Sequence, residues 1–397
     1  MKNAAAKNSQ LTVQPRRWGL EFSLNGWVFL SLMLFMGLAA VNSQANLLFA
    51  FFGLMIGVLI VSVIICWLVM RRVTIGRVLP EHFTVGRPVT INYQISNQKR
   101  FWPTLSLTLT ELDSVEAFTS QPLAYLLHAG PGMTATIPAS VVPRRRGLYT
   151  LNEYRVWTSF PFGFVRCSMV RQQQETALIY PALGKVDPRL LARFTAAERS
   201  GAMIRPKRGG QDEFYGLKEY RQGENPRWIH WKRSARTGTL VTREMTLVSP
   251  PRLVLLVDTC CPNPTPQELA EGERAIAMAA SLASHALETG LLVGLCAWSD
   301  KWVSIQPSRG KQHLREIMTA LARLPRNSSQ DLQSLLENAG DLIKAGSTAV
   351  LFTPQDVESA FGAGGRSSMV VLSSSQPRDQ GWFRFDPAID FEDVENA

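Results

Sequence analysis

Two long apolar runs near the start of the chain constrain its fold more than any other feature. One covers residues 26–41 and the other residues 47–70, and no Lys, Arg, Asp or Glu occurs from residue 26 to residue 70. The second run is long enough to cross the hydrocarbon core of a bilayer, and residues 18–24 extend the shorter first run. So many uncharged residues are too many for the buried core of a soluble protein. The sequence therefore predicts two transmembrane helices joined by a turn at residues 42–46.

The charges that flank this helical hairpin predict its orientation. Basic residues beside a membrane span tend to stay in the cytoplasm, so we expect both termini and the soluble regions to be cytoplasmic. A cleaved signal peptide followed by one anchor is the alternative, because a basic segment also precedes a signal sequence. The basic residues that flank the two runs are Lys2, Lys7, Arg16, Arg17, Arg71 and Arg72.

Residues 73–185 alternate apolar and polar residues in the manner of β-strands. Segments 88–97, 104–112, 133–142 and 148–158 each carry an apolar residue at every second position, and Gly and Pro separate them. Short strands at this spacing predict a β-sandwich of roughly immunoglobulin type. The chain has 5 cysteines without regular spacing, so neither a disulfide framework nor a zinc site is expected.

From residue 250 onward, apolar strand patterns alternate with helical patterns. This alternation predicts a parallel sheet with helices on both faces, a Rossmann-like α/β domain that ends in an acidic tail. The expected strands are residues 253–258, 291–298, 348–353 and 368–374, and the expected helices are residues 268–289, 312–324 and 331–345.

The linker and basic segment at residues 186–249 are chemically the most unusual part of the chain. Residues 201–245 contain ten Lys or Arg, two Trp, two Tyr and one His, interleaved with five Asp or Glu. Three interpretations stay open: an internal clamp of Arg–Glu pairs between domains, a surface for an acidic partner or phosphate, or a site for single-stranded nucleic acid. The acidic residues repel phosphate, so no nucleic-acid partner is expected.

Within this segment, residues 217–244 contain the string LKEY…GENPRWIHWKRSAR. This string resembles the signature L-R-E-Y-x-x-G-D-x-x-R-x-I-x-W-x-x-S-A-R of a bacterial family called domain of unknown function 58, with Lys218 where Arg is common and Glu224 where Asp is common. The family layout also fits, and it implies that the last domain is von Willebrand factor A-like. The expected organisation is a cytoplasmic basic N-terminus (1–25), two transmembrane helices (26–72), a β-sandwich (73–185), the linker and signature segment (186–249) and the α/β domain (250–397).

The resemblance also implies a role for the protein. Members of the family are often encoded beside MoxR-type AAA+ ATPases, transglutaminase-like proteins and other von Willebrand factor A proteins. This implies an adaptor or substrate of an ATPase-driven assembly system in the bacterial inner membrane. We expect the signature to form a charged, aromatic junction between domains that a partner recognises, built from Glu219, Tyr220, Gly223, Glu224, Arg227, Trp231, Lys232, Ser234 and Arg236.

One residue of the α/β domain is a candidate metal ligand. Asp258 ends the first predicted strand, where a von Willebrand factor A domain begins an Asp-x-Ser-x-Ser motif that holds Mg²⁺. Here Cys260 and Pro262 occupy the two Ser positions, and neither offers a hard oxygen ligand. The motif is therefore broken, and a weak Mg²⁺ site would need Thr259 or water as a substitute. No cofactor is expected.

The sequence contains no nucleophile elbow, phosphate-binding loop or paired-histidine metal motif. No catalytic residue is assigned, and an interaction protein is favoured over an enzyme. The competing hypothesis is a hydrolase that uses Glu219 or Glu224 as an acid or base in a pocket.

Overall fold

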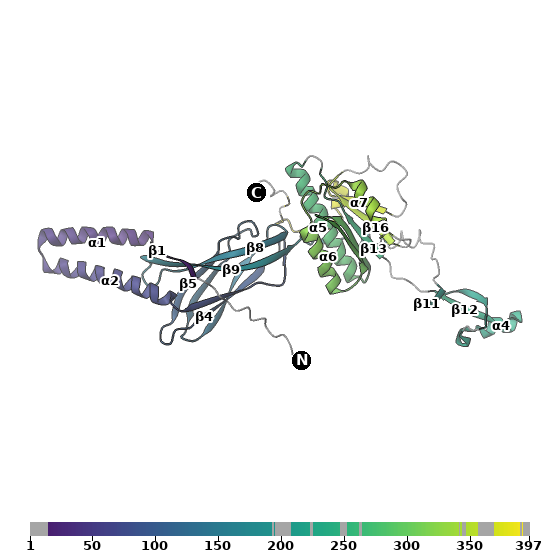
Figure 1. The fold of residues 1–397 in the computed structure, drawn as a ribbon, viewed down its shortest axis with the longest axis horizontal. Helices are drawn as coiled ribbons and strands as arrows, with labels where there is room; N and C mark the ends of the chain where they lie inside the picture. Colours follow the sequence, from purple (N-terminus) through teal and green to yellow (C-terminus); the bar gives the residue numbers. More distant parts are fainter. Residues whose placement is uncertain are drawn as a thin grey trace. The chain divides into compact units, whose positions relative to one another are not determined.

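The structure is a computed structural model of mixed α/β type, with two apolar helices near the N-terminus and several sheets (Figure 1). The chain divides after Ala182 into two compact units, except that Asp386–Asp390 and Ala397 group with the first unit. The residues that the structure describes are 15–192, 194, 208–222, 225–246, 252–261, 264–340, 342–343, 347–355, 369–389 and 391.

The two apolar runs form helices α1 (Leu24–Ser43) and α2 (Asn46–Met70). Both are long and apolar enough to cross a membrane, and few of their side chains are buried inside the protein. Exposed apolar helices are unstable in water, so the pair indicates a membrane anchor. Helix α1 begins at a defined point, because the Ser23 side chain accepts a hydrogen bond from the Gly26 backbone at 3.1 Å.

The segment just before α1 differs from the expectation. Residues 18–24 were expected to extend the first span, and residues 1–25 to form a separate basic terminus. Instead, Pro15–Phe22 form strand β1, which pairs antiparallel with β9 (Val165–Tyr180). The Ser23 backbone N–H donates to the Phe164 carbonyl at 3.0 Å, which fixes the start of α1 at this sheet. Pairing partners so distant in sequence leave no local pattern that could predict them.

Two sheets make up the rest of the first unit. One has six strands in the order β1-β9-β8-β5-β6, with β3 paired to β9, and the other has the order β2-β4-β7. The four predicted strand segments are confirmed as β4, β5, β7 and β8. The bounds are β2 (Val73–Val78), β3 (Phe83–Thr84), β4 (Val89–Asn97), β5 (Thr104–Glu111), β6 (Leu123–Ala129), β7 (Thr134–Val141) and β8 (Gly147–Thr158).

A buried ion network joins the two sheets. Arg77 on β2 pairs with Glu111 on β5 at 2.7 Å and with Glu175 on β9 at 3.2 Å. The Tyr93 hydroxyl on β4 donates to the other oxygen of Glu111 at 2.7 Å. Arg77 is 4% exposed and Glu111 is 0% exposed, so the charges are matched inside the protein rather than by water.

The second unit contains a five-stranded sheet in the order β15-β14-β13-β16-β17. Strands β13, β14, β16 and β17 are parallel, as the sequence predicts, but β15 lies antiparallel at the edge and corrects the expectation of a purely parallel sheet. The bounds are β13 (Arg252–Val257), β14 (Leu292–Trp298), β15 (Trp302–Ser308), β16 (Ser347–Thr353) and β17 (Met369–Ser373).

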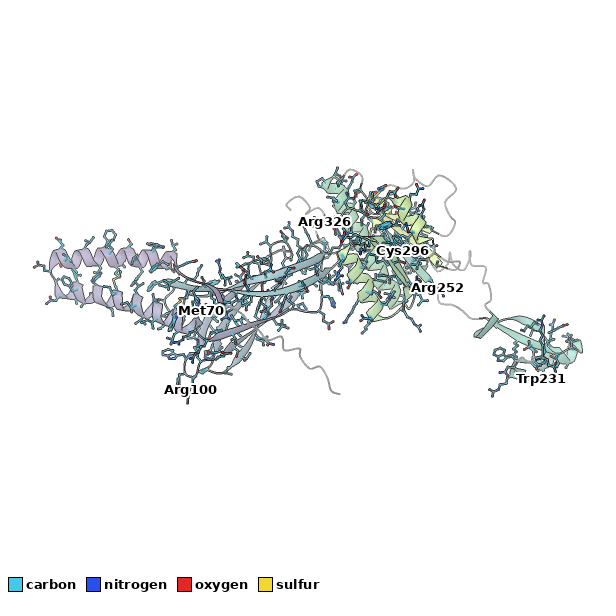
Figure 2. All side chains as sticks on the ribbon, viewed as in Figure 1. Met70, Arg100, Trp231, Arg252, Cys296 and Arg326 are labelled. Atoms are coloured by element: carbon cyan, nitrogen blue, oxygen red, sulfur yellow. The ribbon has the colours of Figure 1, made fainter. Side chains whose placement is uncertain are left out.

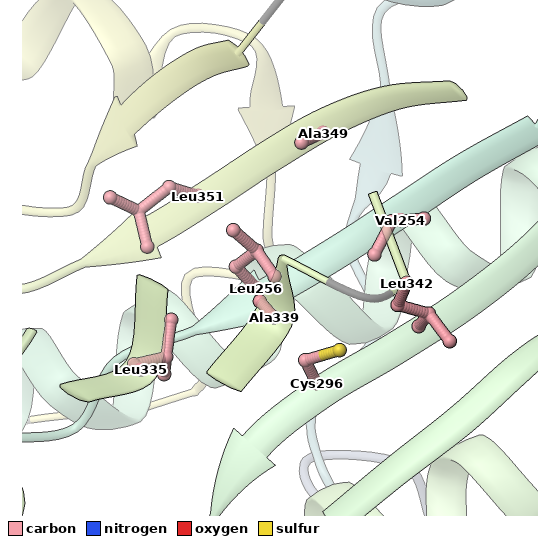
Figure 3. Close-up of a cluster of buried hydrophobic side chains, with 8 residues drawn as sticks. All are labelled: Val254, Leu256, Cys296, Leu335, Ala339, Leu342, Ala349 and Leu351. Carbon is pink, nitrogen blue, oxygen red and sulfur yellow. The ribbon is translucent and has the colours of Figure 1, made fainter. Parts of the chain in front are cut away.

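Helices α5 (Pro266–Glu288), α6 (Lys311–Arg323) and α7 (Leu332–Ala339) cover this sheet. The described part of α7 ends at Ala339, whereas the sequence pattern predicted a helix to residue 345. Alternate residues of β13, β14 and β16 pack against α7. Helix α5 also contacts these three strands. One resulting core cluster contains Val254, Leu256, Cys296, Leu335, Ala339, Leu342, Ala349 and Leu351 (Figure 3).

A short two-stranded sheet joins the beginning and the end of the second unit. Strand β10 (Lys185–Val186) pairs antiparallel with β18 (Phe383–Arg384), which follows the short helix α8 (Pro377–Gln380). The first and last strands of this unit are therefore held together.

Candidate functional site

The signature segment forms a small hairpin of its own. Strands β11 (Arg208–Glu219) and β12 (Val241–Thr246) pair antiparallel, with Glu219 opposite Val241. The connection between them contains the 3₁₀ helix η1 (Pro226–Trp228) and helix α4 (Trp231–Thr237). The most characteristic residues of the signature therefore lie in one short connection that a two-stranded sheet supports.

One group of signature residues faces inward and holds this connection together. Ile229 is 8% exposed, Val241 9% and Thr242 1%. The Ser234 hydroxyl donates to the His230 carbonyl at 3.2 Å and accepts from the Val241 backbone N–H at 2.9 Å. Ser234 thus joins α4 to β12, which explains why a small hydroxyl side chain is needed at this position.

Both ends of α4 carry capping groups. The His230 Nδ1 atom accepts from the Arg233 backbone N–H at 3.3 Å, so the ring proton of the neutral histidine lies on Nε2. At the other end, Gly238 adopts φ 72°, a left-handed conformation that suits glycine, and its N–H donates to the Ser234 carbonyl at 3.0 Å. These two caps fix the length of α4 and therefore the positions of its side chains.

A second group of residues faces outward and is basic and aromatic. Trp231 is 66% exposed at the first position of α4 (Figure 2). Residues 226–237 contain four Lys or Arg and no Asp or Glu. We call this surface the basic face: Arg227, Trp231, Lys232, Arg233 and Arg236, all of them exposed.

Glu219 and Tyr220 lie where β11 ends and the connection begins. Glu219 is exposed at the end of β11, and the Tyr220 backbone N–H donates to the Leu240 carbonyl at 2.8 Å. Gly223 and Glu224 lie outside the described residues. Among the residues that are described, no ion pair joins Arg227 or Arg236 to a carboxylate. The hairpin therefore presents these charges to solvent, and the clamp of Arg–Glu pairs that one interpretation expected is not seen in this part of the chain.

Asp258 lies at the carboxyl end of β13, where the sequence placed it. One carboxylate oxygen accepts from the Cys260 backbone N–H at 2.9 Å, and the other accepts from the Thr353 hydroxyl at 3.0 Å. Burial raises the pKa of this carboxyl above its usual value, and the two hydrogen bonds oppose that shift. The side chain therefore organises the turn after β13.

The donor set around Asp258 does not fit a magnesium ion. Within the described ranges, no group of three or more His, Cys, Asp or Glu side chains could hold a metal ion. At the first Ser position of the motif, Cys260 offers sulfur rather than oxygen, which a hard cation disfavours.

The spacing of the signature does not distinguish its inward-facing residues from its outward-facing residues. Ile229, Val241 and Thr242 form the inner side, and Arg233 extends the basic face. The sequence indicates the inner side only in part, because Ile229 and Val241 are β-branched apolar residues in a mostly polar stretch that also contains exposed apolar residues such as Leu240. Their pairing across the connection, an Ile229–Thr242 bridge, follows only from the three-dimensional structure.

Comparison with known proteins adds one family. The model of the family described as "Protein of unknown function DUF58" matches residues 216–395, which include the end of β11, the basic face and the five-stranded sheet. No curated protein matches the sequence.

Proposed function

Over residues 216–395 this chain belongs to the family of proteins of unknown function DUF58, and from this premise we propose that it is a membrane-anchored protein-interaction module. Its partner is a MoxR-type AAA+ ATPase system, for which the chain serves as adaptor or substrate in envelope or complex assembly. Von Willebrand factor A and transglutaminase-like proteins are the further members of such an assembly.

The basic face is the observation that carries this proposal. It combines exposed Arg and Trp side chains, the residue types that are enriched at the energetic centres of protein interfaces. Its charges have no acidic neighbour within residues 226–237, so an acidic partner surface would complement them. The inward-facing residues hold the connection in one shape, which lowers the entropy that binding must overcome.

The geometry around the helical hairpin supports the proposed anchoring. Strand β1 before α1 and strand β2 after α2 both belong to sheets of the first unit. Both ends of the hairpin therefore return to the same unit and to the same side of a membrane. A cleaved signal peptide would remove β1 from its sheet, so we propose a two-span anchor of the bacterial inner membrane with cytoplasmic soluble units.

We also assign fold types to the soluble units. The α/β unit is assigned to the von Willebrand factor A-like class, because β13 lies centrally in its sheet and Asp258 directly follows the end of this strand. Its metal motif is degenerate, so binding in this proposal does not depend on Mg²⁺. The two sheets of the first unit are assigned to a β-sandwich, joined across their interior by Arg77 and Glu111.

A capture experiment from native membranes tests the proposal. The full chain is solubilised in detergent with ATP or with a slowly hydrolysed analogue, and the recovered proteins are identified by mass spectrometry. The double variant Arg227→Ala/Arg236→Ala removes two exposed charges of the basic face. We expect it to lower recovery of the ATPase by at least about tenfold, since two interface arginines contribute about 1.4 kcal/mol or more together.

A matched control removes two arginine charges outside the signature hairpin. Arg309 and Arg323 are also exposed, and they lie at a distance in sequence from the signature. The variant Arg309→Ala/Arg323→Ala should recover the ATPase as the unchanged chain does. Recovery of no ATPase in either nucleotide state, or equal recovery by both double variants, would contradict the proposed role of the basic face.

Single-stranded nucleic acid is a second candidate ligand, because the basic face is exposed and contains Trp231. Binding of this kind predicts that affinity falls steeply and linearly with the logarithm of salt concentration. A titration of the full chain with labelled single-stranded DNA and RNA at several salt concentrations distinguishes it from protein binding. Saturable binding that Arg227→Ala/Arg236→Ala abolishes would favour this candidate over the ATPase.

A further inference from the structure

We propose that the loop between β4 and β5, residues 98–103, is a third membrane contact of this protein. Its aromatic residues enter the headgroup region of an anionic bilayer beside the end of α2, and they fix the orientation of the first unit on the membrane. This inference rests on the proposed anchoring by α1 and α2, and it adds a contact that neither helix makes.

The position of the loop is set by one buried lysine. The Lys99 ammonium donates to the carbonyls of Leu68 and Val69, at 3.1 Å and 2.7 Å, and to the Thr104 hydroxyl at 2.8 Å. Leu68 and Val69 belong to the last turn of α2, whose unpaired carbonyls attract a positive charge. The loop is therefore attached directly to the end of the second apolar helix. Figure 2 shows Arg100 and Met70, the last residue of that helix, on the side of the sheets from which the helical hairpin extends.

A second side chain makes the loop rigid. The Asn97 amide nitrogen donates to the carbonyls of Trp102, Ala129 and Gly130, at 3.0, 3.0 and 3.1 Å. Its oxygen accepts from the Lys99 backbone N–H at 3.2 Å. Asn97 is 0% exposed, so one buried amide holds this loop against the turn that follows β6. The backbones of the loop and of this turn are therefore held in one conformation, and their exposed side chains have fixed positions.

Large apolar side chains of the loop and the turn are exposed rather than packed against the protein. Phe101 is 76% exposed, Trp102 is 55% exposed, and Met133 on the neighbouring turn is 61% exposed. Aromatic residues favour the boundary between headgroups and hydrocarbon, where their rings are covered and their polar edges stay wet. Burial at this boundary removes their apolar surface from water and therefore stabilises the contact.

The distances fit the thickness of a headgroup layer. Phe101 lies two residues after Lys99, which is about 8 Å of chain at most. The headgroup region adds about 5–8 Å to each side of the hydrocarbon core. A loop tied to the last turn of α2 thus reaches this region without any movement of the fold.

The local charge selects an anionic lipid surface as the occupant. Arg71 and Arg72 follow α2, and Arg100 lies within the loop, all three exposed. The Arg71 guanidinium lies 4.8 Å from the centre of the Trp67 ring, and that of Arg100 lies 5.2 Å from the centre of the Phe101 ring. Residues 88–110 contain no Asp or Glu that would oppose anionic lipid. Basic residues near such a surface are attracted by its negative charge.

Photocrosslinking to lipid tests the inference in the full chain. The photoreactive residue p-benzoyl-phenylalanine replaces Phe101, Leu54 or Leu148 in three separate variants, each reconstituted in nanodiscs of phosphatidylcholine and phosphatidylglycerol. Leu54 is 63% exposed in the middle of α2 and reports on the anchor itself. Leu148 is 54% exposed near the start of β8, ten residues before Thr158, whose carbonyl accepts a hydrogen bond from the Cys66 thiol of α2. This places Leu148 about 33 Å along the strand from the helix.

We expect lipid adducts at positions 101 and 54, each with a yield at least about tenfold above that at position 148, because the bilayer interface ends well short of that residue. Adducts at position 54 without adducts at position 101 would overturn the inference and leave the proposed anchoring intact. Absence of adducts at position 54 would overturn the anchoring and the inference with it. Equal yields at positions 101 and 148 would also overturn the inference, because the contact would not be local.

Discussion

The buried ion network of the first unit and the basic face of the signature hairpin use the same residue type in opposite ways. Arg77 is 4% exposed and contacts two carboxylates and two backbone carbonyls. Arg227 and Arg236 are exposed and form no ion pair with another described residue. A buried arginine must be matched inside the protein, whereas an exposed one keeps its interaction capacity for a partner. Burial, rather than residue type, therefore separates structural charge from charge that is available for recognition.

The largest effect should follow from removing the buried charge. Arg77→Met leaves Glu111 buried without its cation, which should lower the free energy of unfolding by about 3–5 kcal/mol. The free energy of opening can be measured by native-state amide exchange of β4 and β5 in the full chain in nanodiscs. The exposed Arg155 on β8 provides the control, and Arg155→Met should change the same value by less than about 0.5 kcal/mol.

A double variant separates the effect of the Arg77 charge from the effect of its packing. Arg77→Met/Glu111→Leu removes both charges, so it should be more stable than Arg77→Met alone. Equal loss in the double and single variants would show that the packing of Arg77, and not its charge, stabilises the two sheets.

The next largest effect distinguishes the two sides of the signature hairpin. Ile229→Ala removes a side chain that is 8% exposed and should destabilise the hairpin by about 2–4 kcal/mol. Trp231→Ala removes a side chain that is 66% exposed and should leave amide exchange of residues 225–243 nearly unchanged. Partner recovery should nevertheless fall for Trp231→Ala, because the aromatic contact is lost. Faster exchange in both variants would mean that the outward group also supports the fold.

The stability of the first unit should depend on pH through Lys99, whose ammonium contacts the last turn of α2. Burial lowers the pKa of Lys99 from 10.5 to about 8, so the unfolded chain binds more protons than the folded chain between these two values. The free energy of unfolding should therefore rise with pH from about 8 to 10.5, by about 1–3 kcal/mol relative to Lys99→Met. Exchange of the β4 and β5 amides, corrected for the intrinsic pH dependence of exchange, measures the difference. A difference that stays constant across this window would contradict the lowered pKa.

The smallest effect on stability is expected from removing two exposed arginines of the basic face. Arg227→Ala/Arg236→Ala should change the free energy of opening of the hairpin by less than about 0.5 kcal/mol per site, because exposed charges contribute little to folding. Amide exchange of residues 225–243 provides the measurement. A loss as large as that of Ile229→Ala would assign these arginines to the fold and remove the basis for assigning them to a partner.

Periodic patterns made the regular elements predictable. Helix α5 was expected at residues 268–289 and runs from Pro266 to Glu288, because its apolar stripe is continuous and Gly290 follows its end. Strand β15 was not predicted, since it lies at the sheet edge and contains Pro307, and only Ile305 is buried. Strand β1 was missed because its partner β9 lies about 150 residues later in the chain.

The candidate site was predictable in composition but not in arrangement. The spacing of the signature identified Arg227, Trp231 and Arg236, yet no spacing tells which side chains turn inward. Glu111 illustrates the same limit, because its partners Tyr93 and Arg77 lie 18 and 34 residues away. Contacts of this range depend on the packing of sheets, which a local pattern does not contain.

The place of the hairpin in the chain has a consequence for how this protein can change over evolution. The hairpin is inserted between β10 and β13, and its two strands pair only with each other among the described strands. Replacing residues 208–246 with a short flexible linker would leave every strand of the other sheets with its neighbours. Under the proposed function, the hairpin is the element that binds the partner, and this placement would let it be exchanged as a cassette while the sheets that carry it stay the same.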